Sequence, residues 1–161
     1  MSSRNKDHVK DKKTPTARTA VLRQADWLVK ETLQMLCREK TFPRRMRWLI
    51  GEPIADLANK YHSCIMTANA IRVETREEFI ERHKIQTLGL AYLWSLNVKM
   101  GLAQVVLDVD PNKFEPWAKL FNDADRYTKN WISSDTKRYS QRFGPLSDAE
   151  PEEDDPFEPK L

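Results

Sequence analysis

The sequence predicts an all-α protein folded as an up-down-up-down four-helix bundle. Apolar residues recur three and four positions apart along four long segments, a spacing that puts them on one face of a helix. The connections between these segments are short, and a short connection makes consecutive helices antiparallel neighbours. The 161 residues include only four glycines, which disfavours a turn-rich β fold. The sequence shows no strand pattern of weight and no internal repeat.

Each expected helix has its own apolar stripe. Their expected ranges are 20–39, 43–72, 75–108 and 110–133. Together they define a bundle over residues 19–134. A basic arm at 1–18 and a tail at 135–161, first basic and then acidic, lack the helical periodicity, and we expect both to be disordered.

The second helix contains a proline in its interior. It begins at Pro43, a first helical position where the missing N–H costs no bond. Pro53 removes the bond to the carbonyl of Leu49, at a cost of about 3 kcal/mol in a regular helix interior. Because the apolar stripe keeps its phase across Pro53, we predict one helix with a kink near Gly51 rather than two separate helices.

The third and fourth helices have clear start signals. Thr75 and Glu78 form a capping box, and Asp110 with Pro111 supplies an N-cap and a first helical position. The third helix is apolar on more than one side. A helix of that kind is central in a bundle or lies at a subunit interface, and we expect both here.

The cysteine and tryptophan residues are assigned to packing. Cys37 and Cys64 fall on apolar helix faces and form no C-x-x-C pair, which predicts reduced, buried thiols in a cytoplasmic protein. Tryptophans on helix faces are more often core or interface than platforms for nucleic-acid bases. We therefore assign Trp27, Trp48 and Trp94 to packing.

The net charge of +3 hides an asymmetry along the chain. Residues 1–18 hold six Lys and Arg against two Asp, whereas 147–161 hold seven acids against one Lys. A basic body with an acidic tail indicates a polyanionic partner, with the tail as competitor or solubiliser. No apolar run approaches the roughly 20 residues of a membrane span, and no secretion signal is apparent, so we expect a soluble, cytoplasmic protein without membrane contact.

Basic residues gather at two places, before the second helix and around the start of the third. As candidates for binding nucleic acid or a partner we select Arg38, Lys40, Arg44, Arg45, Arg47, Arg72, Arg76, Arg82 and Lys84. Simpler roles compete with this interpretation. The last four can pair with nearby glutamates at helical spacing, and the first two complement the dipole at a helix C-terminus.

Several segments of the chain carry a resemblance to one known family. These are FPRRMRWLIGE at the start of the second helix, TANAIR at its end, LGLAYLWSLNVKMGLA in the third and NWISS in the fourth. They resemble the four-helix bundles of the accessory variability determinant proteins of diversity-generating retroelements. The related intervening-sequence proteins encoded within bacterial large-subunit ribosomal RNA genes share this fold. The resemblance covers about residues 20–133.

The resemblance implies a homo-oligomer, specifically a barrel-like homopentamer with a basic surface. It also implies binding to a reverse transcriptase and to its RNA template or complementary DNA.

One enzymatic alternative remains open. Arg76 and His83 have the R-x6-H spacing of the metal-independent ribonuclease motif of HEPN domains, in which His acts as acid/base and Arg steadies the phosphate. The sequence has no E-x-x-H for a di-iron site, no zinc spacing and no phosphate-binding glycine loop, so we predict no metal and no cofactor. The primary prediction is therefore a non-catalytic accessory protein that binds nucleic acid.

Overall fold

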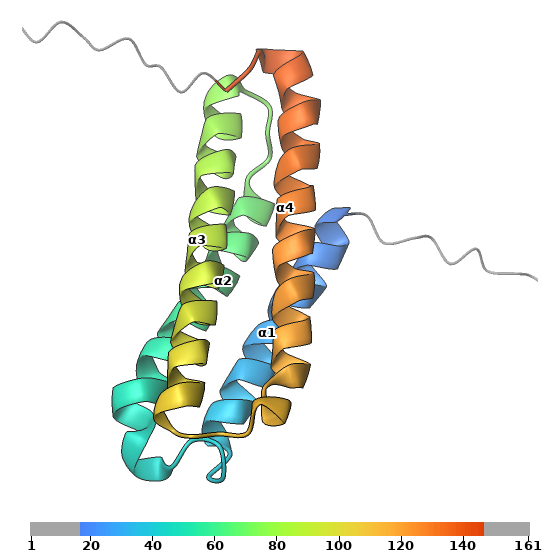
Figure 1. The fold of residues 1–161 in the computed structure, drawn as a ribbon. Helices are drawn as coiled ribbons and strands as arrows, with labels where there is room; N and C mark the ends of the chain where they lie inside the picture. The colour runs from blue at the N-terminus through green and yellow to red at the C-terminus, as the bar shows by residue number, and fades with distance from the viewer. Residues whose placement is uncertain (1–16, 147–161) are drawn as a thin grey trace, which may run out of the picture.

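The computed structural model describes residues 17–146, which form four α-helices and no strand. The helices are α1 Ala17–Cys37, α2 Glu52–Ala70, α3 Arg76–Val106 and α4 Glu115–Phe143. Consecutive helices run in opposite directions (Figure 1), which confirms the predicted four-helix bundle. Among the described residues, no helix is both long enough and apolar enough to cross a membrane.

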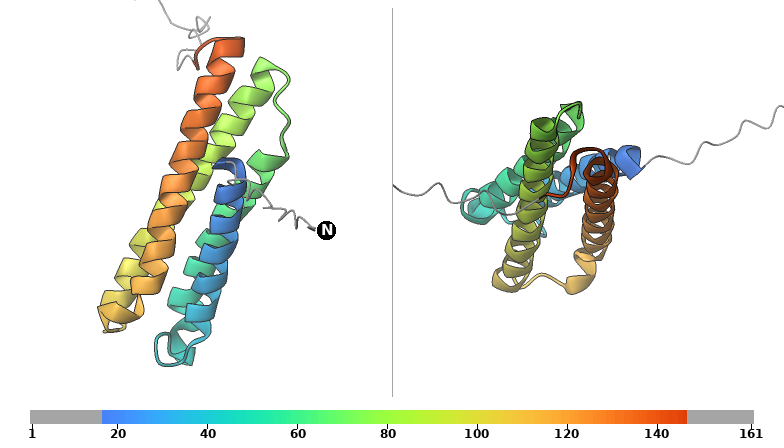
Figure 2. Two further views of the ribbon diagram at one scale, coloured as in Figure 1. Left: turned by 90° about the vertical axis from the view of Figure 1, so that its right-hand side faces the viewer. Right: turned by 90° about the horizontal axis from the view of Figure 1, so that it is seen from above.

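The four helices differ in length, and this gives the bundle two unlike ends. α3 and α4 have 31 and 29 residues, whereas α1 and α2 have 21 and 19. The two long helices therefore extend beyond α1 and α2 at one end (Figures 1 and 2). We call this end, residues 71–84 and 135–146, the upper pole. The opposite end, residues 38–51 and 107–114, is the lower pole.

The core lies between all four helices, and each helix packs against two neighbours. Two side-chain hydrogen bonds join helices in the middle of this mostly apolar core. The hydroxyls of Tyr61 and Thr128 lie 3.0 Å apart, and Trp117 Nε1 donates to Thr32 Oγ1 at 2.8 Å. Burial raises the pKa of Tyr61 to about 12, so its hydroxyl stays protonated at neutral pH. α2 and α3 approach each other closely at Gly89, where a Cβ would lie 3.0 Å from that of Cys64.

The predicted kink is present, but it takes the form of a change of helix type. A 3-10 turn, Arg44–Met46, is followed by a π turn, Arg47–Gly51, before α2 begins. The N–H of Glu52 bonds to the carbonyl of Arg47, five residues back, and Pro53 falls in the first turn of α2. Proline is tolerated in the first turn of an α-helix. The α-helix expected from 43 therefore begins only at Glu52, and residues 44–51 before it are helical but of other types.

The capping box of α3 is confirmed. Glu78 N–H donates to Thr75 Oγ1 at 3.3 Å, and the Glu78 carboxylate accepts from the backbone N–H groups of Thr75 at 2.9 Å and Glu74 at 2.8 Å. Those two backbone donors lower the pKa of Glu78 because they stabilise its ionised form.

The ends of the bundle were predicted less well. Asp110 caps a 3-10 turn, Pro111–Lys113, and α4 then runs to Phe143, ten residues past the expected end at 133. The predicted boundary of the bundle at 134 is therefore wrong. At the other end, α1 begins at Ala17, and Arg18 donates to the side chain of Asn69 and, at 2.9 Å, to its carbonyl. The predictions of disorder for 1–16 and 147–161 lie outside the described residues.

Several side chains that were assigned to burial or packing are wholly or partly exposed. Cys37 is exposed and Cys64 half-buried, because each lies at the edge of its helix's apolar stripe. Trp27, Trp48 and Trp94 are exposed, Trp48 by 71%. These tryptophans are not part of the bundle core, which is filled by others such as Trp117 and Trp131. Trp94 still packs edge-on against Phe121, with ring centroids 5.6 Å apart.

Candidate nucleic-acid interface

The lower pole is built around a buried phenylalanine in the turn between α1 and the 3-10 turn. Phe42 is fully buried, and its ring centroid lies 6.3 Å from that of Phe114 in the α3–α4 connection. The N–H groups of Thr41 and Phe42 both bond to the carbonyl of Arg38. The turn that carries the basic residues is therefore fixed in place by packing and by its own backbone.

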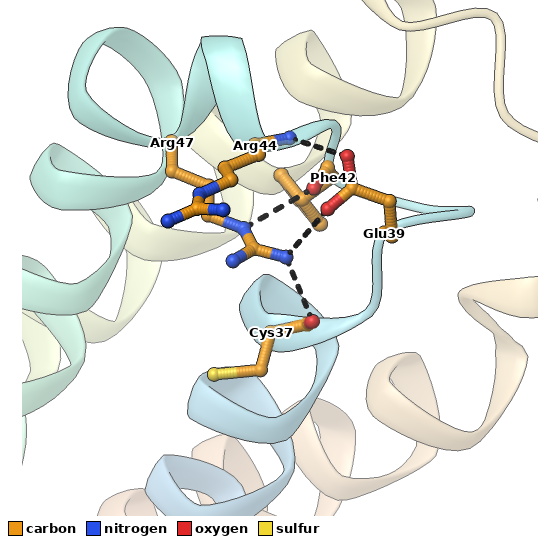
Figure 3. A network of polar contacts seen from close by, with 5 residues as sticks. All are labelled: Cys37, Glu39, Phe42, Arg44 and Arg47. Carbon is orange, nitrogen blue, oxygen red and sulfur yellow. Dashed lines mark hydrogen bonds and ion pairs between the residues drawn. The ribbon is translucent and has the colours of Figure 1, made fainter.

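The Arg47 side chain holds this turn in place through hydrogen bonds to its backbone and to Glu39 (Figure 3). Its Nη2 donates to the Cys37 carbonyl at 2.9 Å and to Glu39 Oε2 at 3.1 Å, and its Nε donates to the Phe42 carbonyl at 3.4 Å. The guanidinium thus satisfies a carbonyl that the end of α1 leaves without a helical partner. Its donors are committed within the chain, so Arg47 is a weaker candidate for phosphate binding than its neighbours.

Arg44 and Arg45 differ from Arg47 in this respect. Both side chains are exposed, and neither forms an ion pair with a carboxylate within residues 17–146. Only the backbone N–H of Arg44 is used, as a donor to Glu39 Oε1 at 2.9 Å (Figure 3). Lys40 is likewise exposed and unpaired in that range, whereas Arg38 pairs with Glu31 at 3.1 Å.

An open hollow of about 480 Å³ lies beside these residues, between the α1 turn and the α3–α4 connection. Its lining residues are Arg38, Glu39, Lys40, Thr41, Asn112, Lys113 and Pro116. Lys113 was not among the candidates from the sequence. The signal was present, because in an up-down-up-down bundle the first and third connections lie at the same end.

Arg82, by contrast, is part of the core of the upper pole. It is only 4% exposed, and its Nη2 lies 2.7 Å from Asp135 Oδ2. Gln86 donates to the same carboxylate oxygen at 2.9 Å, and the guanidinium lies 5.0 Å from the centroid of the Trp131 ring. Burial removes Arg82 from the proposed binding surface. Its partner is Asp135 on α4, and not one of the nearby glutamates that the sequence suggested.

The other three candidates at the upper pole are more accessible. Arg72 and Lys84 are exposed and have no ion pair among the described residues. Arg76 is half-buried and donates to the Pro145 carbonyl at 3.5 Å. A helix the length of α4 spans roughly 43 Å, at about 1.5 Å per residue. The nine predicted residues therefore divide between the two distant ends of the bundle and do not form one site.

Arg76 and His83 lie on the same side of α3, and each has contacts within the chain. They lie two turns apart on α3, which separates their Cα atoms by roughly 10 Å. The His83 ring packs against Phe79, with centroids 6.4 Å apart, and Arg76 is engaged with Pro145. Residues 17–146 contain no cluster of three His, Cys, Asp or Glu side chains that could hold a metal ion.

The second apolar side of α3 faces outward. Leu88, Val98, Leu102 and Val105 are between 47% and 78% exposed. With Ala91 and Ser95 they form a row at alternating spacings of three and four, which we call the outer face of α3. A small cavity of about 130 Å³ between Leu49, Pro53, Leu102 and Val106 links this face to the exposed apolar side chains of the π turn.

Comparisons with protein-family models, with curated proteins and with solved structures gave no match for this chain.

Proposed function

We propose that this protein is a non-catalytic accessory protein that self-associates and binds nucleic acid at the lower pole of its bundle. The outer face of α3 is the observation that carries this proposal. The bundle is already complete without these side chains, so the exposed row is surplus to folding. Contiguous exposed apolar surface of this kind is typical of protein–protein interfaces.

The spacing along the outer face supports a helical partner. Alternating steps of three and four residues form the heptad pattern by which α-helices pack against each other. A second copy of the chain supplies such a helix, and a ring of five copies is the assembly that the family resemblance implies.

Assembly would strengthen a modest basic surface. Each copy contributes Lys40, Arg44, Arg45 and Lys113 at its lower pole, all exposed and without a carboxylate partner among the described residues. An assembly of several copies brings several such basic surfaces together, so one nucleic acid can contact more than one of them. Each contact with a phosphate group releases counterions, which favours binding. Bound RNA or complementary DNA would lie across this pole.

The protein partner follows from the resemblance alone. The segments FPRRMRWLIGE and TANAIR, together with the bundle fold, support a place beside the reverse transcriptase of a diversity-generating retroelement in the cytoplasm. The proposal predicts that a gene adjacent to this one encodes a reverse transcriptase and that the two proteins co-purify.

Salt-dependent binding to fluorescein-labelled single-stranded RNA tests the nucleic-acid part. The variant Arg44→Gln/Arg45→Gln should bind more weakly, with a salt slope shallower by about one to two units per copy engaged. The variant Arg72→Gln/Lys84→Gln removes the same charge from the upper pole and is the matched control. Equal losses in both variants would refute a site at the lower pole.

The same assay addresses the nuclease alternative. Cleavage of the labelled RNA that disappears in His83→Ala would favour a ribonuclease that uses Arg76 and His83. Retention without cleavage supports the accessory role.

A further inference from the structure

The end of α4 carries a concentrated positive charge that the bundle does not neutralise. Its last eight residues, 136–143, include Lys137, Arg138 and Arg142 and no acid. All three side chains are exposed, and none forms an ion pair within residues 17–146. Arg138 and Arg142 lie one turn apart on the same side of the helix, where like charges repel each other.

The helix dipole accounts for only part of this charge. A cation in the last turn of a helix is favoured, by about 0.3–1 kcal/mol at an exposed site, but the effect falls off beyond that turn. Arg142 lies in the last turn of α4, whereas Lys137 and Arg138 lie further back. A nearby source of negative charge would account for all three.

The chain itself supplies such a source directly after α4. Gly144 has a positive φ of 87°, a conformation that turns the chain sharply after the helix. Arg76 donates to the carbonyl of Pro145, so the described chain ends beside the start of α3 (Figure 1). Residues 147–161, with seven acids and one Lys, follow from this point.

The attachment point of that segment favours the nearer pole. Residue 147 follows directly on Leu146 at the upper pole, next to the end of α4, whereas the lower pole is roughly 43 Å away. Tethering at this short range gives an effective concentration of about millimolar or above, so even weak ion pairs form in cis.

We propose that the acidic segment 147–161 binds in cis to the basic end of α4, at Lys137, Arg138 and Arg142. The segment competes there with phosphate groups and confines nucleic acid to the lower pole. The contact itself is independent of the proposed function, whereas its effect on RNA binding rests on that function.

Carbodiimide cross-linking of the full chain, read by mass spectrometry, tests the contact without nucleic acid. Carboxylates of 147–161 should couple to Lys137 more than to Lys40 or Lys113 at the lower pole. The variant Arg138→Gln/Arg142→Gln keeps Lys137 as the reporter and should lose most of that coupling. Arg44→Gln/Arg45→Gln is the matched control and should not. Equal coupling at both poles would overturn the proposal.

A mixture of isotopically heavy and light protein separates cis from trans contact. Cross-links within one copy support the proposal, whereas links that join heavy to light copies overturn its cis assignment.

RNA binding provides a second test of the proposal. Replacing the seven acids of 147–161 by Asn and Gln in the full chain should tighten binding several-fold at low salt. The gain should persist in the Arg44→Gln/Arg45→Gln background and vanish in the Arg138→Gln/Arg142→Gln background. An equal gain in both backgrounds would indicate a general charge effect and contradict competition at α4. If no variant binds RNA, the proposed function fails while the cross-links still decide the contact.

Discussion

The two poles of the bundle both hold clustered arginines, yet the arginines are held in different ways. At the lower pole, Arg44 and Arg45 are exposed, while Arg47 binds two backbone carbonyls and Glu39. At the upper pole, Arg82 is buried against Trp131 and paired with Asp135. The comparison shows that surrounding carbonyls and carboxylates, rather than local charge density, decide whether a guanidinium stabilises the fold or remains available to a ligand.

The largest expected effect comes from breaking the buried pair of the upper pole. Asp135→Ala leaves Arg82 charged and uncompensated in the interior, which should lower the free energy of unfolding by about 3–5 kcal/mol. Urea denaturation at a fixed protein concentration measures this. In the double variant Arg82→Met/Asp135→Leu, most of the loss should be recovered because no buried charge remains. A loss below about 1 kcal/mol in Asp135→Ala would contradict a structural role for the pair.

At the lower pole the expected losses are smaller and confined to one arginine. Arg47→Ala removes the charged donor to the carbonyls of Cys37 and Phe42 and should cost about 1–2 kcal/mol, reduced by its partial exposure. Arg44→Ala and Arg45→Ala should each change stability by less than about 0.5 kcal/mol. Urea denaturation of the three variants side by side tests this ranking. Equal losses in all three would contradict the conclusion that Arg47 stabilises the fold while Arg44 and Arg45 do not.

The π turn of the lower pole should tolerate a larger residue. A Cβ at Gly51 would meet Leu36 at 3.6 Å and Arg47 at 3.7 Å, which are ordinary contacts, and its backbone is helical. Gly51→Ala should therefore raise stability by about 0.5–1 kcal/mol through lower chain entropy in the unfolded state. Thermal unfolding measures the shift in stability. Gly89→Ala is the contrasting variant and should lose stability, because its new Cβ would lie 3.0 Å from that of Cys64.

The smallest effect concerns the pH dependence of the upper pole. Backbone N–H donors lower the pKa of Glu78 from its ordinary 4.5. The stability that ionised Glu78 adds to the folded state is therefore complete above pH 4.5, and it is lost as the pH falls through the lower pKa of the folded state. Glu78→Gln should be slightly less stable than the natural chain at neutral pH, and the difference should shrink in acid. Denaturation midpoints at both pH values test this, and a difference that grows in acid would have the wrong sign.

The sequence predicted the features that depend on local order. The helical stripes, the capping box of Thr75 and Glu78, and the position of the kink all follow from residues within a few turns of each other. The form of the kink did not follow, because a π turn that shifts Pro53 into the first turn of α2 looks in sequence like a proline in mid-helix.

The candidate site was predicted only in part, because long-range contacts decide which of its residues are buried and which are exposed. Arg82 and Asp135 are far apart in sequence, and no local pattern pairs them. The length of α4 could have been predicted, since Trp131, Asp135, Tyr139 and Phe143 continue the four-residue spacing. The basic composition of 137–142 concealed this continuation. Exposure of the outer face of α3 was expected from its second apolar side.

The molar mass of the full chain in solution tests the central claim, self-association through the outer face of α3, most directly. Light scattering at tens of micromolar should give a multiple of 18.9 kDa. Val98→Glu/Leu102→Glu should reduce the mass to one chain, while Leu33→Glu on the exposed side of α1 should leave it unchanged. A natural chain that stays at 18.9 kDa under these conditions would contradict the account.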